Sequence, residues 1–278
     1  HPLSPEYSRY GQFNILNDSS NNRVQRLVMG LAATNPAKGT NAYKIANIYE
    51  LAMDSVRRNR EGAAPIKADL AKIENTKPED MENLLIWIHR NYGSPFFNAA
   101  PQEDLGNSNI YAMYVGSTGL GLGDRDYYLL KDKKHKDILN AYDRLIQTDM
   151  KLAGYSAKDA KRIAKNVIKI ETLLADSTWT REQSRNIPAM YNIRTMAQLQ
   201  EMYPNIPWNR WFKETMNIDA PETVIVTEIN TVKQADKLIK TLSDREKKDY
   251  YLWEYVSGAA PYLSDDFANA SFEFNKVM

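Results

Sequence analysis

The stretch GLGLGDRDYYL, residues 119–129, says most about the fold of this chain. Glycines alternate with leucines up to Gly123, and Asp124 and a pair of tyrosines follow. Glycine lets the backbone turn tightly and approach other groups closely, and Asp is favoured where a helix starts. We therefore predict a tight turn leading into a helix that Asp124 caps and Tyr127 and Tyr128 anchor. A phosphate-binding loop is the weaker interpretation, because the stretch lacks both Gly-Lys-Ser/Thr and G-x-G-x-x-G.

Helical periodicity dominates the rest of the chain. After Ser156, the residues Ile163, Val167, Ile170 and Leu174 recur every three or four positions and form one apolar stripe. Further helices are predicted for residues 18–33, 40–59, 65–74 and 78–92. Four sites also carry the capping-box pattern of a helix start, in which a hydroxyl residue precedes an acid or amide by three positions. They are Ser156–Asp159, Thr195–Gln198, Thr231–Gln234 and Ser243–Glu246.

Strand signals are few. Tyr111, Met113 and Val115 alternate with smaller residues, which predicts a short strand, and residues 224–226 are a second candidate. Polar and proline residues interrupt the helical pattern at 98–108 and 178–188, which we expect to be loops. The fold class predicted is mainly α: a multi-helix domain with one or two short β-strands or a hairpin.

Composition excludes several classes of function. The 36 Lys and Arg residues nearly balance the 35 Asp and Glu residues, for a formal net charge of +1, so no long-range field favours nucleic acid. The basic run at residues 131–136 is interpreted as a solvated helix face. No apolar stretch reaches the roughly 18 to 20 residues of a membrane span, so no transmembrane segment is predicted. The chain has no cysteine, which removes disulfides and thiolate chemistry.

Catalytic groups are also missing from the pattern. A catalytic zinc ion needs at least three converging protein ligands and an open position for water. His1, His89 and His135 are far apart in sequence, and no His-Glu-x-x-His occurs. His89 is expected to be an ordinary helical residue, on the surface or half-buried. Ser117 lacks the Gly-x-Ser-x-Gly spacing of a nucleophile elbow. The acid pairs at 124 and 126 and at 265 and 266 are assigned to helix starts. No catalytic residue, metal ligand or cofactor is predicted within this chain.

Several stretches together resemble the N-terminal half of the neprilysin and endothelin-converting enzyme family of zinc metallopeptidases. Residues 119–129 are similar to the family's Gly-Leu-Gly-Leu-x-x-Arg-Asp-Tyr-Tyr segment. The same order of similar segments continues at residues 8–16 (SRYGQFNIL), 185–192 (RNIPAMYN), 197–199, 206–208, 223–226 and 271–274. The resemblance covers nearly the whole chain.

The resemblance implies a division of labour. Residues 1–20 would be a strip that packs on a C-terminal catalytic domain of the same polypeptide, and residues 21–278 would be a helical lid domain. The zinc ligands and the general base of the family lie downstream of the segment at 271–274. The chain starts at His1 without a signal segment and stops within an apolar-periodic stretch, which favours a truncated form. We expect this chain alone to be inactive, while the parent protein carries zinc.

Arg9 is the candidate substrate-binding residue. In the resembling family the matching arginine helps to receive the free C-terminal carboxylate of short peptides, a task suited to the planar guanidinium group. The family's nearby Asp and second Arg correspond here to Asn14 and Asn17, and an asparagine cannot hold Arg9 by charge.

The function expected from the resemblance is that of the N-terminal lid of a zinc-dependent metalloendopeptidase that hydrolyses peptides. Mammalian members are rich in disulfides, so the absence of cysteine points to a bacterial member, with an extracytoplasmic location in the periplasm or at the cell surface. The alternative from another class is a stand-alone helical surface protein that binds peptides or glycans through its 17 Tyr and 5 Trp residues. A His-Glu-x-x-His sequence after residue 278 in the gene would support the peptidase, and a stop codon the binding protein.

Overall fold

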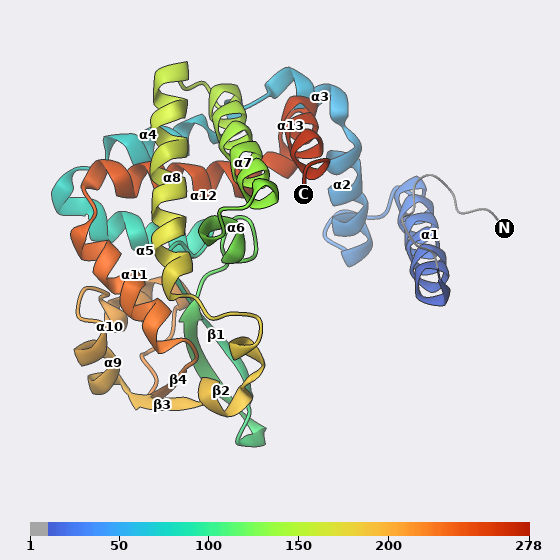
Figure 1. Cartoon of the computed structure of the whole chain (residues 1–278). Coiled ribbons are helices and arrows are strands. Elements are labelled where there is room, and N and C mark those ends of the chain that lie inside the picture. The colour runs from blue at the N-terminus through green and yellow to red at the C-terminus, as the bar shows by residue number, and fades with distance from the viewer. Residues whose placement is uncertain (1–10) are drawn as a thin grey trace. The chain divides into compact units, whose positions relative to one another are not determined.

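The computed structural model describes residues 11–278. Two compact units make up the chain, residues 1–60 and residues 61–278 (Figure 1). Helices dominate both, and the described residues contain a single small four-stranded sheet. The predicted mainly α class is confirmed, although the sheet has more strands than the one or two expected.

The first unit consists of helices. These are α1 (Gln12–Ala33), α2 (Asn41–Met53) and α3 (Ser55–Glu61), the last of which ends one residue past the unit. The prediction of one helix over residues 40–59 was wrong at Asp54, where the backbone leaves the helical region at ψ 69°. The Asp54 carboxylate accepts a hydrogen bond from the Arg57 N–H at 2.9 Å, so a polar residue that competes for the backbone restarts the helix.

Apolar side chains of the first unit are largely exposed. α1 and α2 pack against each other, yet Ala46 is the only buried residue among the described residues of α1, α2 and α3. Phe13, Leu27 and Ile48 each expose two thirds or more of their surface. The predicted boundary after residue 20 falls inside α1, and the role expected of residues 1–20 remains a prediction.

The second unit is a helical body with the sheet at one end (Figure 1). Its α-helices are α4 (Lys67–Asn75), α5 (Met81–Asn91), α6 (Asp126–Leu129), α7 (Lys133–Leu152), α8 (Ala157–Ser177), α9 (Met196–Met202), α10 (Trp208–Trp211), α11 (Ile229–Thr241), α12 (Asp244–Ala259) and α13 (Asp265–Asn275). α8 contacts α6, α7, α11 and α12, so it is the central helix of the body. The predicted helices at 65–74 and 78–92 are confirmed as α4 and α5 with short 3₁₀ turns before them.

The sheet has the strand order β1-β2-β4-β3. Its strands are β1 (Phe97–Asp104), β2 (Asn107–Ser117), β3 (Asn192–Thr195) and β4 (Thr223–Val226). β1 and β2 form an antiparallel hairpin, β4 runs parallel to β2, and β3 is antiparallel to β4. The prediction of a loop at 98–108 was wrong. β1 lies at the edge of the sheet, so it pairs with one strand only, and the missing N–H of Pro101 breaks no hydrogen bond to a second strand. One face of β1 is exposed to solvent, which explains its polar residues.

Most of the predicted helix starts are confirmed. Ser243 and Glu246 form a reciprocal capping box, as do Thr195 and Gln198. The hydroxyl of Ser156 accepts a hydrogen bond from the Asp159 N–H. The helix start at Thr231 was wrong, because Thr231 lies inside α11.

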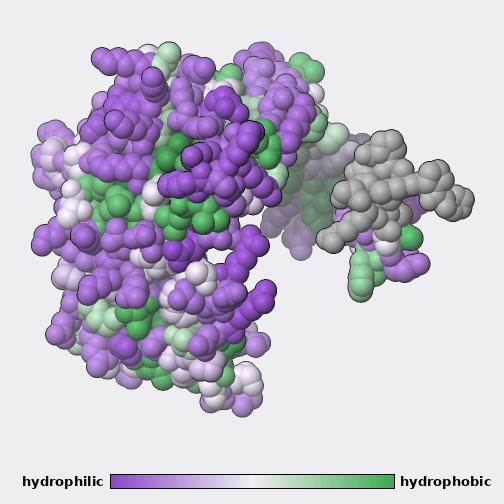
Figure 2. Space-filling view, viewed as in Figure 1, coloured by the Kyte–Doolittle hydropathy of each residue, from purple (hydrophilic) through white to green (hydrophobic). Residues whose placement is uncertain are grey.

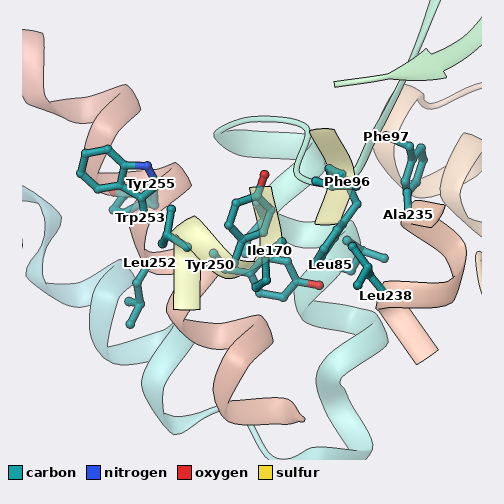
Figure 3. Packing of buried hydrophobic residues seen from close by; sticks show 14 of the residues in the cluster. Leu85, Phe96, Phe97, Ile170, Ala235, Leu238, Tyr250, Leu252, Trp253 and Tyr255 are labelled. Atoms are coloured by element: carbon teal, nitrogen blue, oxygen red, sulfur yellow. The ribbon is translucent and has the colours of Figure 1, made fainter. Parts of the chain in front are cut away.

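The core of the second unit is continuous. Buried residues of α5, α8, α11 and α12 form one cluster, which Phe96 joins from the segment before β1. Figure 3 shows Phe96, Ile170 and Tyr250 in this cluster. On the face in Figure 2, hydrophilic residues cover most of this unit and hydrophobic residues gather in separate patches.

Candidate functional site

The glycine-rich segment joins β2 to α6 and is held against the core. Gly123 adopts the left-handed conformation with φ 74°, which favours glycine at this turn. A Cβ atom at Gly121 would overlap the Tyr142 hydroxyl and lie 2.9 Å from Glu171 Oε1. Asp124 accepts a hydrogen bond from the Asp126 N–H at 2.9 Å, at the start of α6. The predicted tight turn is confirmed. The capping role predicted for Asp124 was wrong, because Arg125 is the residue that precedes α6 and the helix has no side-chain cap, while Asp124 binds the Asp126 N–H from within the turn.

A buried carboxyl group organises this region. Tyr128 and Tyr142 donate hydrogen bonds to the two oxygens of Glu171, at 2.8 and 3.1 Å. The Tyr128 hydroxyl accepts from the Leu122 N–H at 2.9 Å, and the Tyr142 hydroxyl accepts from Trp253 Nε1 at 2.9 Å. Through these bonds Glu171 on α8 ties together the glycine-rich segment, α6, α7 and α12. Tyr128 is confirmed as an anchor of the segment.

Burial changes the acidity of this group. Complete burial, with a smaller effect from the charge of Glu254, raises the pKa of Glu171 to about 8, against the lowering effect of the tyrosine hydrogen bonds. Burial likewise raises the pKa of Glu254 to about 7. Glu171 is therefore mostly protonated at pH 7, whereas Glu254 is about half protonated. Through the Tyr128 hydroxyl, the hydrogen bonds of Glu171 hold the backbone of the glycine-rich segment in place.

Beside this cluster lies a cavity lined by residues of the second unit. Its volume is about 810 Å³, within the range of small-molecule and peptide-side-chain sites. Gly119, Leu120 and Gly121 form one wall, and residues of α7, α12 and α13 form the others. Aromatic rings contribute much of the surface, among them Trp253 and Phe272. The clustered hydrogen bonds of Glu171 thus fix one wall of an apolar, aromatic cavity.

Two acids line the cavity. Asp149 on α7 is only 3% exposed, and its Oδ1 atom has no hydrogen-bond partner. Burial alone raises its pKa to about 7, since no neighbouring charge contributes. Glu254 on α12 is the second acid of the lining. Among the described residues that line this cavity there is no Lys, Arg or His.

The histidines do not converge. His89 is buried on α5, where its Nε2 lies 2.9 Å from the Pro95 carbonyl oxygen and its ring packs on Phe97. Burial lowers its pKa to about 4, so it is neutral at physiological pH. The expectation of a surface or half-buried position was therefore wrong, because the chain folds back at Pro95 and covers the ring. His135 interacts with Asp132, which caps α7.

No metal site can be assembled from the part of the chain that the structure describes. Within residues 11–278, no group of three or more His, Cys, Asp or Glu side chains has the arrangement to hold a metal ion. The zinc ion that the resemblance implies does not fit these residues. In the same residues, no helix is long and apolar enough to cross a membrane.

The segment at 185–192 has a structural role. The Tyr191 hydroxyl donates a hydrogen bond to Asp104 at 2.7 Å, near the tip of the β1–β2 hairpin. The Asn192 amide donates to the Val226 carbonyl oxygen at 3.0 Å, which joins β3 to β4. A Cβ atom at Gly106 would lie 2.6 Å from the Tyr191 hydroxyl, so the hairpin turn and this tyrosine fit each other closely. Residues 185–192 therefore hold the hairpin tip and link β3 to β4.

The predicted substrate-binding residue Arg9 lies outside the described residues, as does His1. Asn14, which follows it in the strip, accepts a hydrogen bond from the Gly11 N–H at the start of α1. Sequence reasoning did not single out Glu171 or Asp149. A signal existed for both, because each acid occupies a position within the apolar stripe of its helix, Glu171 after Val167 and Asp149 after Ile146.

Comparison with known proteins places this fold. The crystal structure of Mycobacterium tuberculosis zinc metalloprotease ZMP1 in complex with inhibitor matches with a TM-score of 0.88 and 25% identity, over 99% of this chain and 42% of that chain. PepO from Lactobacillus rhamnosis has the same fold, with a TM-score of 0.79 at 17% identity, over 99% of this chain and 43% of that one. The architecture is thus that of a helical region found in zinc metalloproteases.

Sequence comparison gives the family. Residues 1–278 match the family model described as Peptidase family M13. Endothelin-converting enzyme 1 of Cavia porcellus is 27% identical over 289 residues, which span 100% of this chain and 38% of that protein. The enzyme of the same name from Rattus norvegicus is 26% identical, over 100% of this chain and 37% of its own length. The chain belongs to peptidase family M13 and corresponds to its N-terminal domain. It spans less than two fifths of the length of these relatives.

Proposed function

We propose that this chain is the N-terminal, lid-forming portion of a zinc-dependent metalloendopeptidase that hydrolyses peptides. The observation that carries the proposal is the family match over residues 1–278, combined with relatives of which the chain covers only 38%. A solved structure of this fold is named a zinc metalloprotease. Because the described residues offer no metal site, the zinc ligands and the general base would come from polypeptide outside these 278 residues.

The proposed task of this portion is to restrict access to the catalytic centre. A rigid helical body suits that task, since a wall that excludes folded proteins must hold its shape while substrates enter. The second unit offers such a body, because one face of α8 is buried along its length and Glu171 joins four of its segments. Substrates would then be selected by size and extension before side chains are recognised.

The proposed partner of the chain is the catalytic domain of the same polypeptide. Support comes from the first unit, where Phe13, Leu27 and Ile48 are exposed on helices with almost no core of their own. Apolar surface of this kind marks a site of contact with another protein surface. Residues 1–20 are proposed to take part in this contact, and peptides are the proposed substrates.

Arg9 is proposed to bind the free C-terminal carboxylate of short peptides. The proposal rests on the similarity of residues 8–16 to the opening segment of the family. A guanidinium group can bind a carboxylate with two parallel hydrogen bonds, which a neutral amide end does not match. The bacterial neighbours in fold fit the predicted bacterial origin, and an extracytoplasmic location is proposed with it.

The burial of the tryptophans weakens the alternative of a stand-alone peptide- or glycan-binding protein. Trp208, Trp211 and Trp253 are buried in the core of the second unit, and the other two tryptophans are half-buried. The alternative needs Trp rings exposed on the outer surface, and none of the 5 Trp residues is exposed in that way.

The gene sequence after residue 278 and an activity assay test the proposal together. A His-Glu-x-x-His sequence downstream, with zinc and peptide cleavage in the longer protein, is the expected result. A stop codon directly after Met278 would contradict the proposal and favour the binding protein.

A further inference from the structure

The cavity beside the glycine-rich segment has an unusual chemical character. Its surface is mainly apolar and aromatic, with the rings of Tyr142, Trp253 and Phe272 in its lining. Into this surface project two acids, Asp149 and Glu254, and no basic residue. Aromatic faces and carboxylates both attract cations, and together they form the usual environment for an ammonium or guanidinium group.

Asp149, which lines the cavity, has a carboxylate oxygen without a hydrogen-bond partner. The side chain is almost completely buried, yet its Oδ1 atom has no hydrogen-bond partner. Buried polar atoms in folded proteins are nearly always paired, so an unpaired carboxylate oxygen in a residue that lines a cavity marks a place for a donor. Glu171, a buried acid next to Gly121, differs because two tyrosine hydroxyls donate hydrogen bonds to it.

No basic residue of the second unit pairs with Asp149. Lys276 on α13 lies over the Phe272 ring, 4.7 Å from its centroid, and pairs with Glu273 at 2.5 Å. In that contact a cation lies over one face of the Phe272 ring. No charged neighbour acts on Asp149, so no positive charge offsets the cost of burying its carboxylate.

We propose that this cavity is a binding site for an organic cation, in which an amidinium, guanidinium or ammonium head pairs with Asp149 while its apolar body packs on the aromatic rings. Glu254 supplies a second carboxylate on the opposite helix. The volume of about 810 Å³ leaves room for a body of aromatic size or for a Lys or Arg side chain with its flanking peptide. A metal ion is a poorer occupant, because the residues that the structure describes provide no group of three ligands here. The inference does not depend on the proposed peptidase role.

The test uses benzamidine as the probe and the complete 278-residue chain. Benzamidine is expected to bind with one-to-one stoichiometry in calorimetry at pH 8 and to shift the indole N–H resonance of Trp253, which lines the cavity. Benzamide, the neutral analogue of the same shape, should bind at least tenfold more weakly. Equal binding of the two compounds, or no binding of benzamidine at millimolar concentration, would overturn the proposal even without any variant.

A pair of variants locates the site. Asp149→Asn keeps the shape of the side chain and removes its charge, so it should weaken benzamidine at least tenfold. Asp143→Asn is the matched control: it lies on the same helix, its carboxylate accepts a hydrogen bond from Gln147, and it does not line the cavity. The control should bind like the unaltered chain. Full affinity in Asp149→Asn would contradict the assignment.

The pH and a second ligand pair complete the test. Asp149 and Glu254 are the acids that face the cavity, and Tyr142 is the other titratable group in the lining. The pKa values of both acids are raised to about 7, so affinity should increase at least tenfold from pH 5.5 to pH 8.5. A short peptide with one Arg, compared with the same peptide containing citrulline, distinguishes a peptide side chain from a small amine as the source of the cation. Displacement of benzamidine by millimolar Ca²⁺ or Mg²⁺ would show a metal site instead and would overturn the proposal.

Discussion

Replacement of the buried Glu171 by glutamine should change how the stability of the second unit depends on pH. In the folded chain the pKa of Glu171 is raised from 4.5 to about 8, mainly by burial. A carboxyl group with a raised pKa binds its proton more tightly when folded, so the free energy of unfolding falls as pH rises from about 4.5 towards 8. Above that range, the penalty for a buried charge is fully present.

The magnitude follows from the same shift. One pKa unit corresponds to about 1.4 kcal/mol, so the full penalty is about 5 kcal/mol at high pH. Between pH 5.5 and pH 8.5 the penalty grows by about 3 kcal/mol. Glu171→Gln carries no titrating group and retains an oxygen for one of the tyrosine hydrogen bonds. Relative to the unaltered chain, the variant should therefore gain about 3 kcal/mol of stability across this range.

Urea denaturation followed by tryptophan fluorescence measures this difference. All 5 Trp residues lie in residues 61–278, so the signal reports on the second unit alone. Glu182→Gln, at an exposed position, is the control and should follow the unaltered chain at every pH. A constant difference between Glu171→Gln and the unaltered chain at all pH values would refute the reasoning, because it would mean that Glu171 does not titrate differently on folding.

Three further results are expected. Gly121→Ala should destabilise the second unit by about 1–3 kcal/mol in urea denaturation, because its methyl group overlaps the Tyr142 hydroxyl, whereas Gly119→Ala, with no atom within 4 Å of the new Cβ, should cost less than about 1 kcal/mol. Equal costs would remove close packing as the reason for the glycine. In the longer, zinc-bearing protein, Arg9→Ala should reduce kcat/KM for short peptides with a free C-terminal carboxylate by a factor of about 10 to 100 and leave their amides nearly unchanged, whereas equal losses would exclude Arg9 from carboxylate binding. The same protein should digest peptides of a few kilodaltons and leave stably folded proteins intact, and rapid cleavage of a folded protein in a gel assay would count against the lid.

Local patterns predicted the helices well. Ser243 with Glu246 and Thr195 with Gln198 mark helix starts because the two side chains satisfy the backbone within four residues, and such signals need no distant partner. Thr231 has the same spacing, but its hydroxyl donates to the Ser177 carbonyl oxygen at 2.7 Å. That partner is 54 positions away, and the spacing alone does not reveal it.

The sheet and the buried acids depended on tertiary contacts. β1 contains Pro101 and several polar residues, so only its pairing with β2 makes it a strand. Asp149 and Glu171 each interrupt an apolar stripe, and a stripe alone does not tell whether an acid in it is solvated, paired or left unpaired beside a cavity. The resemblance of residues 119–129 identified the family, but the reason for Gly121 became clear only when Tyr142 and Glu171 were found against it.

The central proposal is that catalysis belongs to polypeptide outside these 278 residues. Metal analysis and peptide cleavage should be measured in parallel on this chain and on a form extended to the full length of its relatives. The extended form is expected to hold one zinc ion per molecule and to cleave short peptides in a chelator-sensitive reaction, while the 278-residue chain does neither. Stoichiometric zinc with chelator-sensitive cleavage in the 278-residue chain would contradict the account.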